Sequence, residues 1–508
     1  MKKIYFSLIL AVGALFTTSC DMDKAPYGSL DETTAIQDMN DISRFRAMFY
    51  RNLRSMTNGE WITLQELQMD MFHGLTSNGN RGGVMSNGLI TSSYDDIESM
   101  WAGAYSCIAD ANYGITKTQE MIESGDFEGD DITMLKRYQG EAYFQRAFCY
   151  YWLADHFCPA YTAANGETAA LGAPLVTVYN PSGDVESYPS RSTLNETYKL
   201  IEDDLQNAYA EISAYEAIDN SQVAPNASYL SSYAVLALQA RVALLKQDYA
   251  TALSKAEQVI NSGVYTLTGI DDYAEMWSED TGTEVIFRPF ASKEELPASL
   301  GEYFLSSGEN RADYIPTYAM LDMYDEGDVR FDAFFTVYSN LDVEGRTIPA
   351  YVFNKFPGNV SLRTGTANNL CNMSKPFRLS EVYLIAAEAA ASNNDATKAN
   401  RYLNDLRAKR IEGYASQNYA GSGLTEQIRN ERLKELIGEG FRLSDLRRWG
   451  IGFERYPDHP ENPNLNNVIV AAGRSLTYLS DDHRFVWPIP ATEIDANPNL
   501  KGQQNAGY

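Results

Sequence analysis

Apolar residues recur at three- and four-residue steps along most of the chain, a pattern that predicts amphipathic helices. It begins near Ile36 and is strong over 135–157 and 194–212, and Ser192 or Thr193 stands where a cap for the latter helix is expected. Alternating apolar and polar residues, which mark half-buried strands, are few by comparison. The pattern therefore predicts a mostly α-helical protein with a few short strands.

Three stretches interrupt the helical pattern. The segment 78–93 is rich in glycine and asparagine, and 159–189 is punctuated by proline and glycine, so both are expected to form loops. The third, 266–375, mixes periodicities and contains two possible short strands, 284–289 and 351–355. We interpret it as an irregular, loop-rich insertion into one domain. Loops on a rigid scaffold are where binding surfaces concentrate.

Two predicted helix pairs form a weak internal repeat. The first joins 231–246 to 249–262, and the second joins 378–392 to 396–409. Helix pairs of ~34 residues are the tetratricopeptide period. We expect a tetratricopeptide-like scaffold, and two unrelated helical hairpins are the alternative. Small and apolar residues match between the first helices of the two pairs: Ala237, Ala240 and Leu244 in one, Leu384, Ala387 and Ala391 in the other.

A charged helix is predicted over 426–449. Glu431 and Glu435 lie one turn apart, and Glu435 is within reach of Arg432 on the same helix. An anion-binding or catalytic site is one interpretation of this density of charge. We favour a salt-bridged structural helix with a break at Gly440.

The N-terminus has the pattern of an export signal. Lys2 and Lys3 precede an apolar run over 4–16, which is shorter than the ~20 residues of a spanning helix. Small polar residues then lead to Cys20, whose position predicts cleavage and lipidation, and two or more acyl chains hold a protein stably on a membrane. Thr17 stands where leucine is commonest in such signals. An ordinary signal peptide with an incidental cysteine is the alternative.

The predicted organisation follows from this start. We expect a signal peptide over 1–19, a lipidated acidic tether over 20–31 and a single domain over 32–508 that includes the insertion 266–375. No later segment is apolar for 18 residues, so nothing else in the sequence is expected to span a membrane.

Composition narrows the partners. The net charge of −27 repels nucleic acid phosphates and anionic lipids, and it suits a neutral or cationic ligand. Hydrophobic residues make up 44% of the chain, enough for a real core. Four cysteines besides Cys20 lack metal-binding spacing. Cys149 and Cys158 are candidates for a disulfide, but we expect buried free thiols for most of the four: Cys107, Cys149, Cys158 and Cys371.

The sequence lacks the common motifs of catalysis. The four histidines are not at metal-ligand spacing, and no nucleophile elbow or Walker loop is present. The segment 79–83 resembles a phosphate loop but lacks its lysine and hydroxyl residue, so we interpret it as a flexible loop. A glycosidase needs only two carboxylates, and no pair stands out among 68 acidic residues. We expect a protein that is not an enzyme and has no cofactor.

One acidic cluster is a candidate for calcium. Asp126, Glu128, Asp130 and Asp131 offer the hard oxygen ligands that calcium prefers. They lack the order of a calcium-binding loop. We favour a solvated acidic loop and predict no metal site.

Aromatic residues carry the strongest hint of a ligand. Tyrosine (34) outnumbers phenylalanine (21), and a tyrosine presents an apolar face with a polar tip. Asn78, Asn80 and Arg81 are candidates for hydrogen bonds to sugar hydroxyls. For each residue alone, local packing is the alternative. Several aromatics fall in predicted loops, where flat rings suit the stacking of sugars: Trp61, Tyr94, Trp277, Tyr303 and Tyr314.

Several longer segments carry a resemblance to a known family. They run from one end of the chain to the other, and the tail is the most specific of them. They are Cys20 with Asp21 and Asp23 behind it, 141–153, 377–389, 439–448 and the tail 487–508, which opens with Trp487-Pro488-Ile489-Pro490. The sequence resembles the SusD/RagB family of Bacteroidetes nutrient-binding outer-membrane lipoproteins.

The resemblance implies a function that the motifs alone do not give. It implies four tetratricopeptide-like units with a ligand site on the insertions, a lipid anchor on the outer leaflet of the outer membrane, and a SusC-like TonB-dependent transporter as partner. Such proteins bind and do not cleave. Tyr94 matches the loop-to-helix position of a stacking aromatic in sugar-binding members. We expect surface capture of oligosaccharides; a peptide-binding member of the family and a surface glycoside hydrolase are the alternatives.

Overall fold

The computed structural model describes residues 35–167, 170–306, 310–455 and 462–508. The predicted signal peptide, Cys20 and the tether lie outside the described residues. The chain divides into a first unit that ends at Phe45 and a second unit, Arg46–Tyr508. Helix α2 (Met39–Met56) begins in the first unit. Everything below concerns the second.

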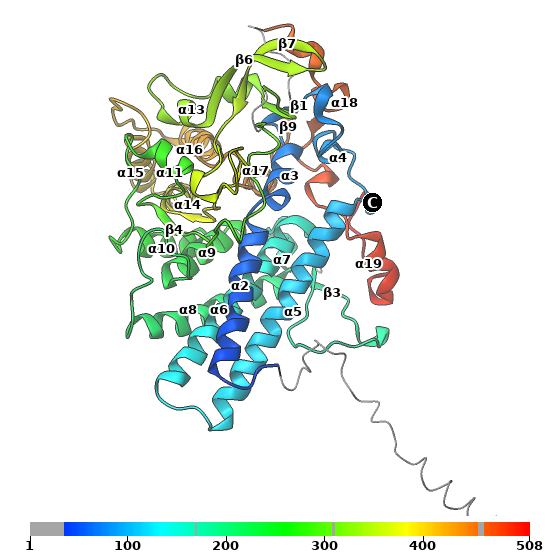
Figure 1. The fold of residues 1–508 in the computed structure, drawn as a ribbon, viewed down its shortest axis with the longest axis vertical. Helices are drawn as coiled ribbons and strands as arrows, with labels where there is room; N and C mark the ends of the chain where they lie inside the picture. The colour runs from blue at the N-terminus through cyan, green and yellow to red at the C-terminus, as the bar shows by residue number, and fades with distance from the viewer. Residues whose placement is uncertain (1–34, 168–169, 307–309, 456–461) are drawn as a thin grey trace, which may run out of the picture. The chain divides into compact units, whose positions relative to one another are not determined.

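A series of helices forms the scaffold of this unit. Neighbours in the series pack on one another: α5 on α6, α6 on α8, α8 on α9, and α14 on α15 and α16 (Figure 1). The predicted mostly α, helix-pair scaffold is confirmed. Besides α2, the helices of eight or more residues are α3 (Glu60–Gln68), α5 (Asp95–Ser124), α6 (Asp130–Phe157), α8 (Leu194–Glu216), α9 (Ser232–Leu245), α10 (Tyr249–Ile260), α14 (Leu379–Ser392), α15 (Ala396–Arg407), α16 (Gly421–Leu436) and α17 (Arg442–Trp449).

The internal repeat corresponds to two stacked helix pairs. Helices α9 and α10 form the first, α14 and α15 form the second, and α10 packs against α14. Ala237 and Ala240 of α9 are completely buried, as are Leu384 and Ala387 of α14. Small side chains at such positions let helices approach closely. The sequence pattern thus reflects real packing between the two pairs.

Local chemistry explains where the scaffold helices begin. The Thr193 hydroxyl accepts the Glu196 N–H, and the Glu196 carboxylate accepts the Thr193 N–H, which caps α8. Asp248 and Asp395 cap the second helices of the two pairs, each accepting an N–H from three residues further on. Of the two caps predicted for α8, Thr193 is the right one.

Strands form five two-stranded antiparallel sheets among the described residues. The strand predicted at 284–289 is confirmed as β4. The one predicted at 351–355 is wrong in its bounds, because the register of β7 is set by β6, which the periodicity did not reveal. The pairs are β1 (Phe72–Gly74) with β5 (Tyr314–Pro316), β2 (Leu171–Pro174) with β3 (Arg191–Thr193), β4 (Val285–Phe287) with β8 (Phe377–Arg378), β6 (Phe335–Val343) with β7 (Arg346–Phe353), and β9 (Phe453–Glu454) with β10 (Thr477–Tyr478).

Short helices and turns fill the connections. The helices are α4 (Gly83–Ser86), α7 (Ala163–Glu167), α11 (Tyr273–Ser278), α12 (Tyr318–Leu321), α13 (Val329–Phe334), α18 (Ala471–Arg474) and α19 (Ala491–Ala496). The 3-10 turns are η1 (Thr76–Asn78), η2 (Val185–Ser187), η3 (Val360–Leu362), η4 (Leu465–Val468), η5 (His483–Phe485) and η6 (Pro498–Leu500).

A buried network of charges ties the insertion to the scaffold, and Glu435 of α16 lies at its centre. The Glu435 carboxylate bonds Arg410 (2.9 Å), Arg378 (2.9 Å) and Arg330 (3.1 Å), all of them buried. Burial alone would raise the pKa of Glu435, but Arg410 and Arg378 hold it well below its ordinary value. The structural, salt-bridged interpretation of the charged segment is thus confirmed.

The partners within that segment differ from the prediction. Arg432 was expected to meet Glu435 but bonds Asp445 of α17 at 2.7 Å. The predicted single helix is two, α16 and α17, and the link between them passes through Gly438 and Gly440, both with positive φ. Partners distant in sequence replace those one turn away because the segment is buried against several other elements.

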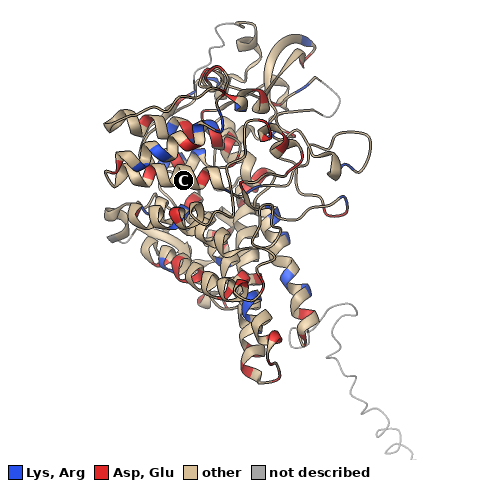
Figure 2. Cartoon of the chain, turned by 90° about the vertical axis from the view of Figure 1, so that its left-hand side faces the viewer, with Lys and Arg blue, Asp and Glu red and all other residues tan. Residues whose placement is uncertain are grey.

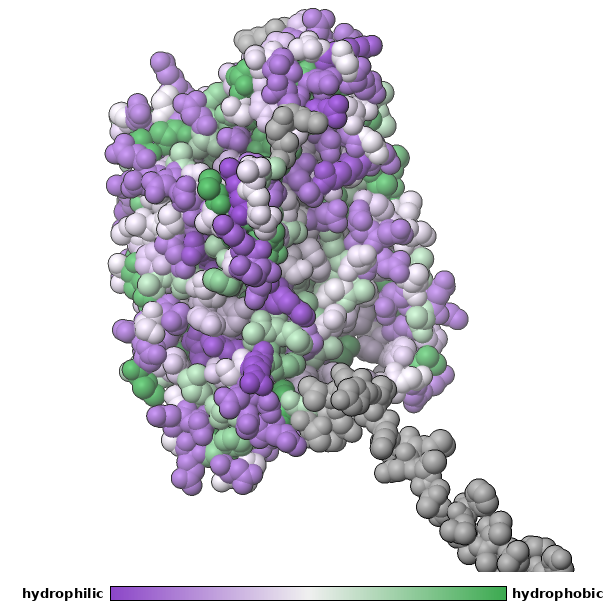
Figure 3. Space-filling view, viewed as in Figure 1, coloured by the Kyte–Doolittle hydropathy of each residue, from purple (hydrophilic) through white to green (hydrophobic). Residues whose placement is uncertain are grey.

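Charged residues of both signs are mixed along the chain (Figure 2), and apolar and hydrophilic residues are mixed on the face that Figure 3 shows. Basic and acidic segments alternate along the helices (Figure 2), and apolar residues are scattered among hydrophilic ones on the face in Figure 3. No described helix is both long and apolar enough to cross a membrane. The expectation of free thiols is confirmed, and Cys149 is not paired with Cys158: Cys107, Cys149, Cys158 and Cys371 are all buried and free.

Candidate ligand-binding site

Side chains from several chain segments meet beside the starts of α3 and α5. The Tyr303 hydroxyl donates to Glu60 Oε1 at 2.9 Å, and the Arg81 guanidinium lies 3.9 Å from the centre of the Tyr303 ring. The Tyr314 hydroxyl donates to the Arg81 carbonyl at 2.7 Å. We call the exposed and half-buried residues of this cluster the Arg81 surface: Glu60, Asn78, Asn80, Arg81, Tyr94, Glu302 and Asp313.

Arg81 is fixed by three neighbours while its side chain stays 38% exposed. Its guanidinium forms ion pairs with Glu302 (2.5 Å) and Asp313 (3.3 Å) and stacks on Tyr303. Burial opposes the charge, but Glu302 and Tyr303 more than offset it and raise the pKa of Arg81. Arg81 is therefore a permanently charged, oriented donor at the surface.

Tyr94 stands at the N-terminal boundary of α5. It is the residue before the helix, its backbone is extended, and its side chain is half-buried. Burial raises the pKa of Tyr94 well above its ordinary value, with further contributions from Asp96, Tyr303 and Glu60. The hydroxyl therefore stays protonated, and it is close enough to Tyr303 and Glu60 to interact with both electrostatically.

The segment before α4 presents its amides on tight turns. Asn78 ends η1, and its side-chain oxygen accepts the Asn80 N–H at 2.8 Å. Asn80 has a left-handed backbone (φ 64°) and an exposed side chain. Gly82 is closely packed: a Cβ there would lie 2.8 Å from a Leu67 methyl group. Residues 79–82 form turns between η1 and α4, so the segment is a loop, as predicted.

The aromatics proposed as a stacking surface divide into two groups. The residues Tyr303, Tyr314 and Trp277 are 1%, 0% and 2% exposed, so their rings offer no face to a ligand in this structure. Tyr303 and Tyr314 instead support Arg81 from within. Trp277 lies in α11 rather than in a loop, and its ring is 4.4 Å from the buried Lys355 ammonium.

Trp61 also differs from its prediction. It lies in α3 rather than in a loop, and its half-buried ring packs 4.5 Å from the ring of Trp152. A Cβ on Gly103 of α5 would lie 3.0 Å from the Trp61 ring, so the ring fills the space between the two helices. The residues proposed from sequence that place accessible groups in the cluster are Asn78, Asn80, Arg81 and Tyr94.

Sequence reasoning missed the acidic members of the site. Glu60, Glu302 and Asp313 come from three separate segments, and no spacing links them to Arg81. One signal was present: each of the three directly precedes a proposed aromatic, namely Trp61, Tyr303 or Tyr314. Consecutive side chains point in different directions, so a buried ring such as that of Tyr303 or Tyr314 leaves its neighbour, Glu302 or Asp313, at the surface.

The four acidic residues considered as calcium ligands lie outside the Arg81 surface, at the connection from α5 to α6. Asp126, Glu128, Asp130 and Asp131 belong to the described residues, in which no three acidic, histidine or cysteine side chains come together in a group able to hold a metal ion. They lie at the connection from α5 to α6, where Asp130 and Asp131 open the second helix. Negative charge is favourable at that end of a helix.

Comparison with known proteins assigns the chain to a family. The SusD family model matches residues 342–508, and the model described as starch-binding associating with outer membrane matches 22–244. SusD-like protein P2 of Formosa agariphila is 23% identical over the whole of both chains. SusD-like protein P25 of the same organism is 32% identical over 140 residues, 26% of this chain and 24% of that relative.

Solved structures agree with that assignment. A putative sugar binding protein from Bacteroides vulgatus matches with a TM-score of 0.76 and 26% identity, covering 94% of this chain and 100% of that one. A SusD superfamily protein from Bacteroides thetaiotaomicron matches with a TM-score of 0.75 and 25% identity, covering 92% and 100%. The chain belongs to the SusD/RagB family.

Proposed function

We propose that this protein binds glycans at the Arg81 surface without cleaving them and delivers them to a TonB-dependent outer-membrane transporter for uptake. The observation that carries the proposal is that Tyr303 lies next to both a half-buried aromatic side chain, Tyr94, and a guanidinium that is already held in place, Arg81. Sugar recognition needs an apolar face for the ring C–H groups and oriented polar groups for the hydroxyls.

The polar groups of the surface suit neutral sugars. Arg81 and the protonated Tyr94 hydroxyl are donors, and Glu302 and Asp313 are acceptors with lone pairs to spare. Asn78 and Asn80 supply both kinds of group. A sugar hydroxyl also donates and accepts, so each can find a partner here, and the groups are ordered before the ligand arrives. Such preorganisation lowers the entropic cost of binding.

The arrangement of carboxylates favours binding over hydrolysis. Glu302 and Asp313 both bond the same guanidinium, that of Arg81, so a cation lies between them. A glycosidase holds its two carboxyl groups on either side of the scissile bond, with roughly 5 to 9.5 Å between them for the substrate or water. The names of the family models and of the sugar-binding structural relative point in the same direction.

Calorimetric titration tests this function. The purified protein would be titrated with neutral oligosaccharides of glucan, mannan, galactan and xylan and with a set of unrelated peptides, and each mixture would be analysed for products by chromatography. We expect heat from at least one oligosaccharide, none from the peptides, and no products. Binding of peptides alone would identify the peptide-binding class instead, and release of shorter sugars would contradict a protein that only binds.

The anchor and the partner are tested separately in cells. We propose that the lipid on Cys20 holds the protein at the outer membrane, exposed at the surface. The substitution Cys20→Ser is expected to release the protein from the membrane fraction and to abolish incorporation of labelled palmitate. Affinity purification of the unmodified protein from mildly solubilised outer membranes is expected to recover a TonB-dependent transporter. Membrane retention of the variant, or a preparation without the transporter, would contradict these two assignments.

A further inference from the structure

Trp449 ends α17 on the scaffold and is not one of the residues of the Arg81 surface. Its indole N–H donates to Glu388 Oε1 of α14 at 2.8 Å, which fixes the plane of the ring. The Arg448 guanidinium lies 4.8 Å from the ring centre and is itself bonded to Glu388 and Asp445. The polar groups of Trp449 and Arg448 are therefore already bonded within the fold.

Arg429 of α16 lies equally close to the Trp449 ring but, unlike Arg448, is not bonded to a carboxylate among the described residues. Its guanidinium is also 4.8 Å from the Trp449 ring centre. Within the described part of the chain, no carboxylate forms an ion pair with it, and its buried Nε has no hydrogen-bond partner. An arginine head presents five donors in a planar fork. This one is positioned by an aromatic ring and has its donors free.

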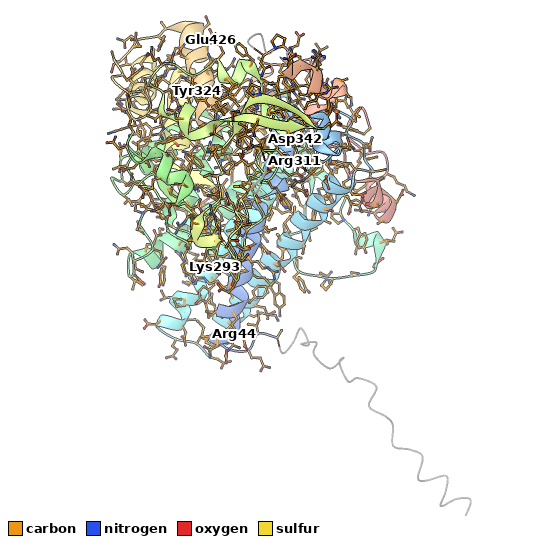
Figure 4. All side chains as sticks on the ribbon, turned by 45° about the horizontal axis from the view of Figure 1, so that its top comes forward. Arg44, Lys293, Arg311, Tyr324, Asp342 and Glu426 are labelled. Carbon is orange, nitrogen blue, oxygen red and sulfur yellow. The ribbon has the colours of Figure 1, made fainter. Side chains whose placement is uncertain are left out.

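Two hollows adjoin Arg429. One is about 260 Å³ and the other about 450 Å³, and both are lined by Thr425, Arg429 and Trp449. The smaller adds the side chains of Gln247, Tyr249 and Ser392, and the larger adds Ser422, Asn430 and Glu426, the last of which is labelled on α16 in Figure 4. The lining also contains two arginines with carboxylate partners, Arg448 paired with Glu388 and Arg442 paired with Asp70. Hydroxyls, amides and aromatic rings thus surround one unpaired guanidinium, that of Arg429.

We propose that these hollows form a second saccharide site, selective for a sugar that carries a carboxylate or a sulfate. The planar guanidinium fork matches either anion with two parallel hydrogen bonds. The hydroxyl and amide groups suit the sugar's own hydroxyls, and Tyr249 and Trp449 offer apolar surface. A neutral sugar would leave the Arg429 charge unused.

The overall charge of the protein does not oppose this selectivity. Charges further apart than about 8 Å are largely screened at physiological ionic strength, so the unpaired Arg429 dominates the potential within the hollows. Two carboxylates line the hollows: Glu388, in the smaller, is bonded to Arg448 and Trp449, and Glu426, in the larger, is exposed. Removal of the Glu426 charge is expected to strengthen binding of an anion, which gives the proposal a second, opposite prediction.

Titrations with three defined probes test the site: a galacturonate trisaccharide, a sulfated galactose trisaccharide and the neutral galactose trisaccharide. Arg429→Gln is expected to weaken binding of the anionic probe by about tenfold or more, as for loss of a charged hydrogen bond, and Glu426→Gln to strengthen it about twofold. Arg401→Gln is the matched control, because Arg401 also stacks on an aromatic ring, that of Tyr402 at 4.4 Å, but lines neither hollow.

The outcomes separate this site from the Arg81 surface. Tyr94→Ala is expected to leave anionic binding unchanged, since Tyr94 belongs to the other site. Failure of both anionic probes to bind the unmodified protein would overturn the proposal, as would equal affinities of the unmodified protein and Arg429→Gln. Loss of anionic binding in Tyr94→Ala with retention in Arg429→Gln would place the ligand at the Arg81 surface and overturn it too.

Discussion

Arg410 and Arg81 contact the same kinds of side chain, but Arg410 is buried and Arg81 is partly exposed to solvent. Each guanidinium lies on a tyrosine ring, Tyr273 at 4.2 Å for Arg410 and Tyr303 at 3.9 Å for Arg81. Each bonds two carboxylates. The side chain of Arg410 is 0% exposed, whereas that of Arg81 is 38% exposed. The same chemistry therefore builds a structural joint in one place and a ligand-facing surface in the other.

Burial decides the difference because water competes for charge. Around Arg410, the carboxylates of Glu284 and Glu435 have lost their water and depend on their arginine partners. Removing one member leaves a buried charge uncompensated, which costs far more than the loss of an exposed pair. Around Arg81, solvent can replace any lost partner, so the donors remain available to a ligand.

The largest expected effect is on stability, from Glu435→Gln. This change removes the carboxylate that Arg330, Arg378 and Arg410 share, and the positive charge left uncompensated is buried. We therefore expect the free energy of unfolding to fall by about 3 to 5 kcal/mol. Urea denaturation followed by circular dichroism measures it. The matched change at the surface, Glu302→Gln, is expected to cost less than about 1 kcal/mol. Similar losses in the two variants would remove the distinction between the clusters.

The next effect is a pH dependence that originates in the buried region. Burial raises the pKa of Glu66 from 4.5 to about 7, despite hydrogen bonds from Gly440 and Phe441. The folded protein therefore holds a proton that the unfolded chain has released between pH 4.5 and about 7. Through linkage, stability falls as pH rises across that window, by roughly 1 to 3 kcal/mol.

A comparison of Glu66→Gln with the unmodified protein isolates this contribution. His156 acts in the opposite sense, because burial lowers its pKa from 6.5 to about 4, and both proteins retain it. We expect the stability difference between the two proteins to change with pH only between 4.5 and about 7. A difference that is constant from pH 4 to 8 would contradict the assignment to Glu66.

The third prediction is that Arg81, unlike Arg410, affects ligand affinity more than stability. Arg81→Gln is expected to reduce affinity for the bound oligosaccharide about tenfold, since it removes charged hydrogen bonds worth roughly 1.5 kcal/mol or more. The unfolding midpoint is expected to stay nearly unchanged. Calorimetry and urea denaturation of the same preparation measure the two. A variant that lost stability but kept its affinity would show that Arg81 resembles Arg410 after all.

The smallest expected effect on stability comes from a surface-exposed ion pair. Arg311 and Asp342 form an ion pair at 3.7 Å, with side chains 60% and 42% exposed, and both are labelled in Figure 4. Solvent screens such a pair, so Asp342→Asn is expected to change the unfolding free energy by at most about 0.5 kcal/mol. Thermal denaturation would check this, and a loss above 1 kcal/mol would mean that exposure alone does not rank these pairs.

The sequence predicted the scaffold better than the insertion. The pairs α9–α10 and α14–α15 follow from local periodicity and from caps such as Asp395, which involve residues close in sequence. The insertion is held by partners far apart, as where β4 meets β8 or Arg410 meets Glu435. Such contacts depend on the whole fold, so no local pattern encodes them.

The candidate site shows the same limit. Tyr94 and Arg81 were identified from residue type and loop context, and both lie in the cluster. Tyr303 and Tyr314 were identified by the same argument and are buried, since residue type does not distinguish a ring that binds a ligand from one that supports a neighbour. The acidic residues that directly precede them, such as Glu302, are marked in the sequence only by that position, and their contact with Arg81 is a product of the fold.

The most direct test of the account is the affinity of Tyr94→Ala for the best-binding neutral oligosaccharide. Stacking on an aromatic ring is worth about 1 to 3 kcal/mol for nucleic acid bases, and a sugar ring is expected to gain a similar amount or less. The control is Tyr215→Ala, because Tyr215 is a tyrosine near the C-terminal end of α8 whose hydroxyl bonds Asp219 at 3.2 Å and which is not part of the Arg81 surface. The account predicts at least a fivefold loss in Tyr94→Ala and none in Tyr215→Ala; equal affinity of Tyr94→Ala and the unmodified protein would contradict it.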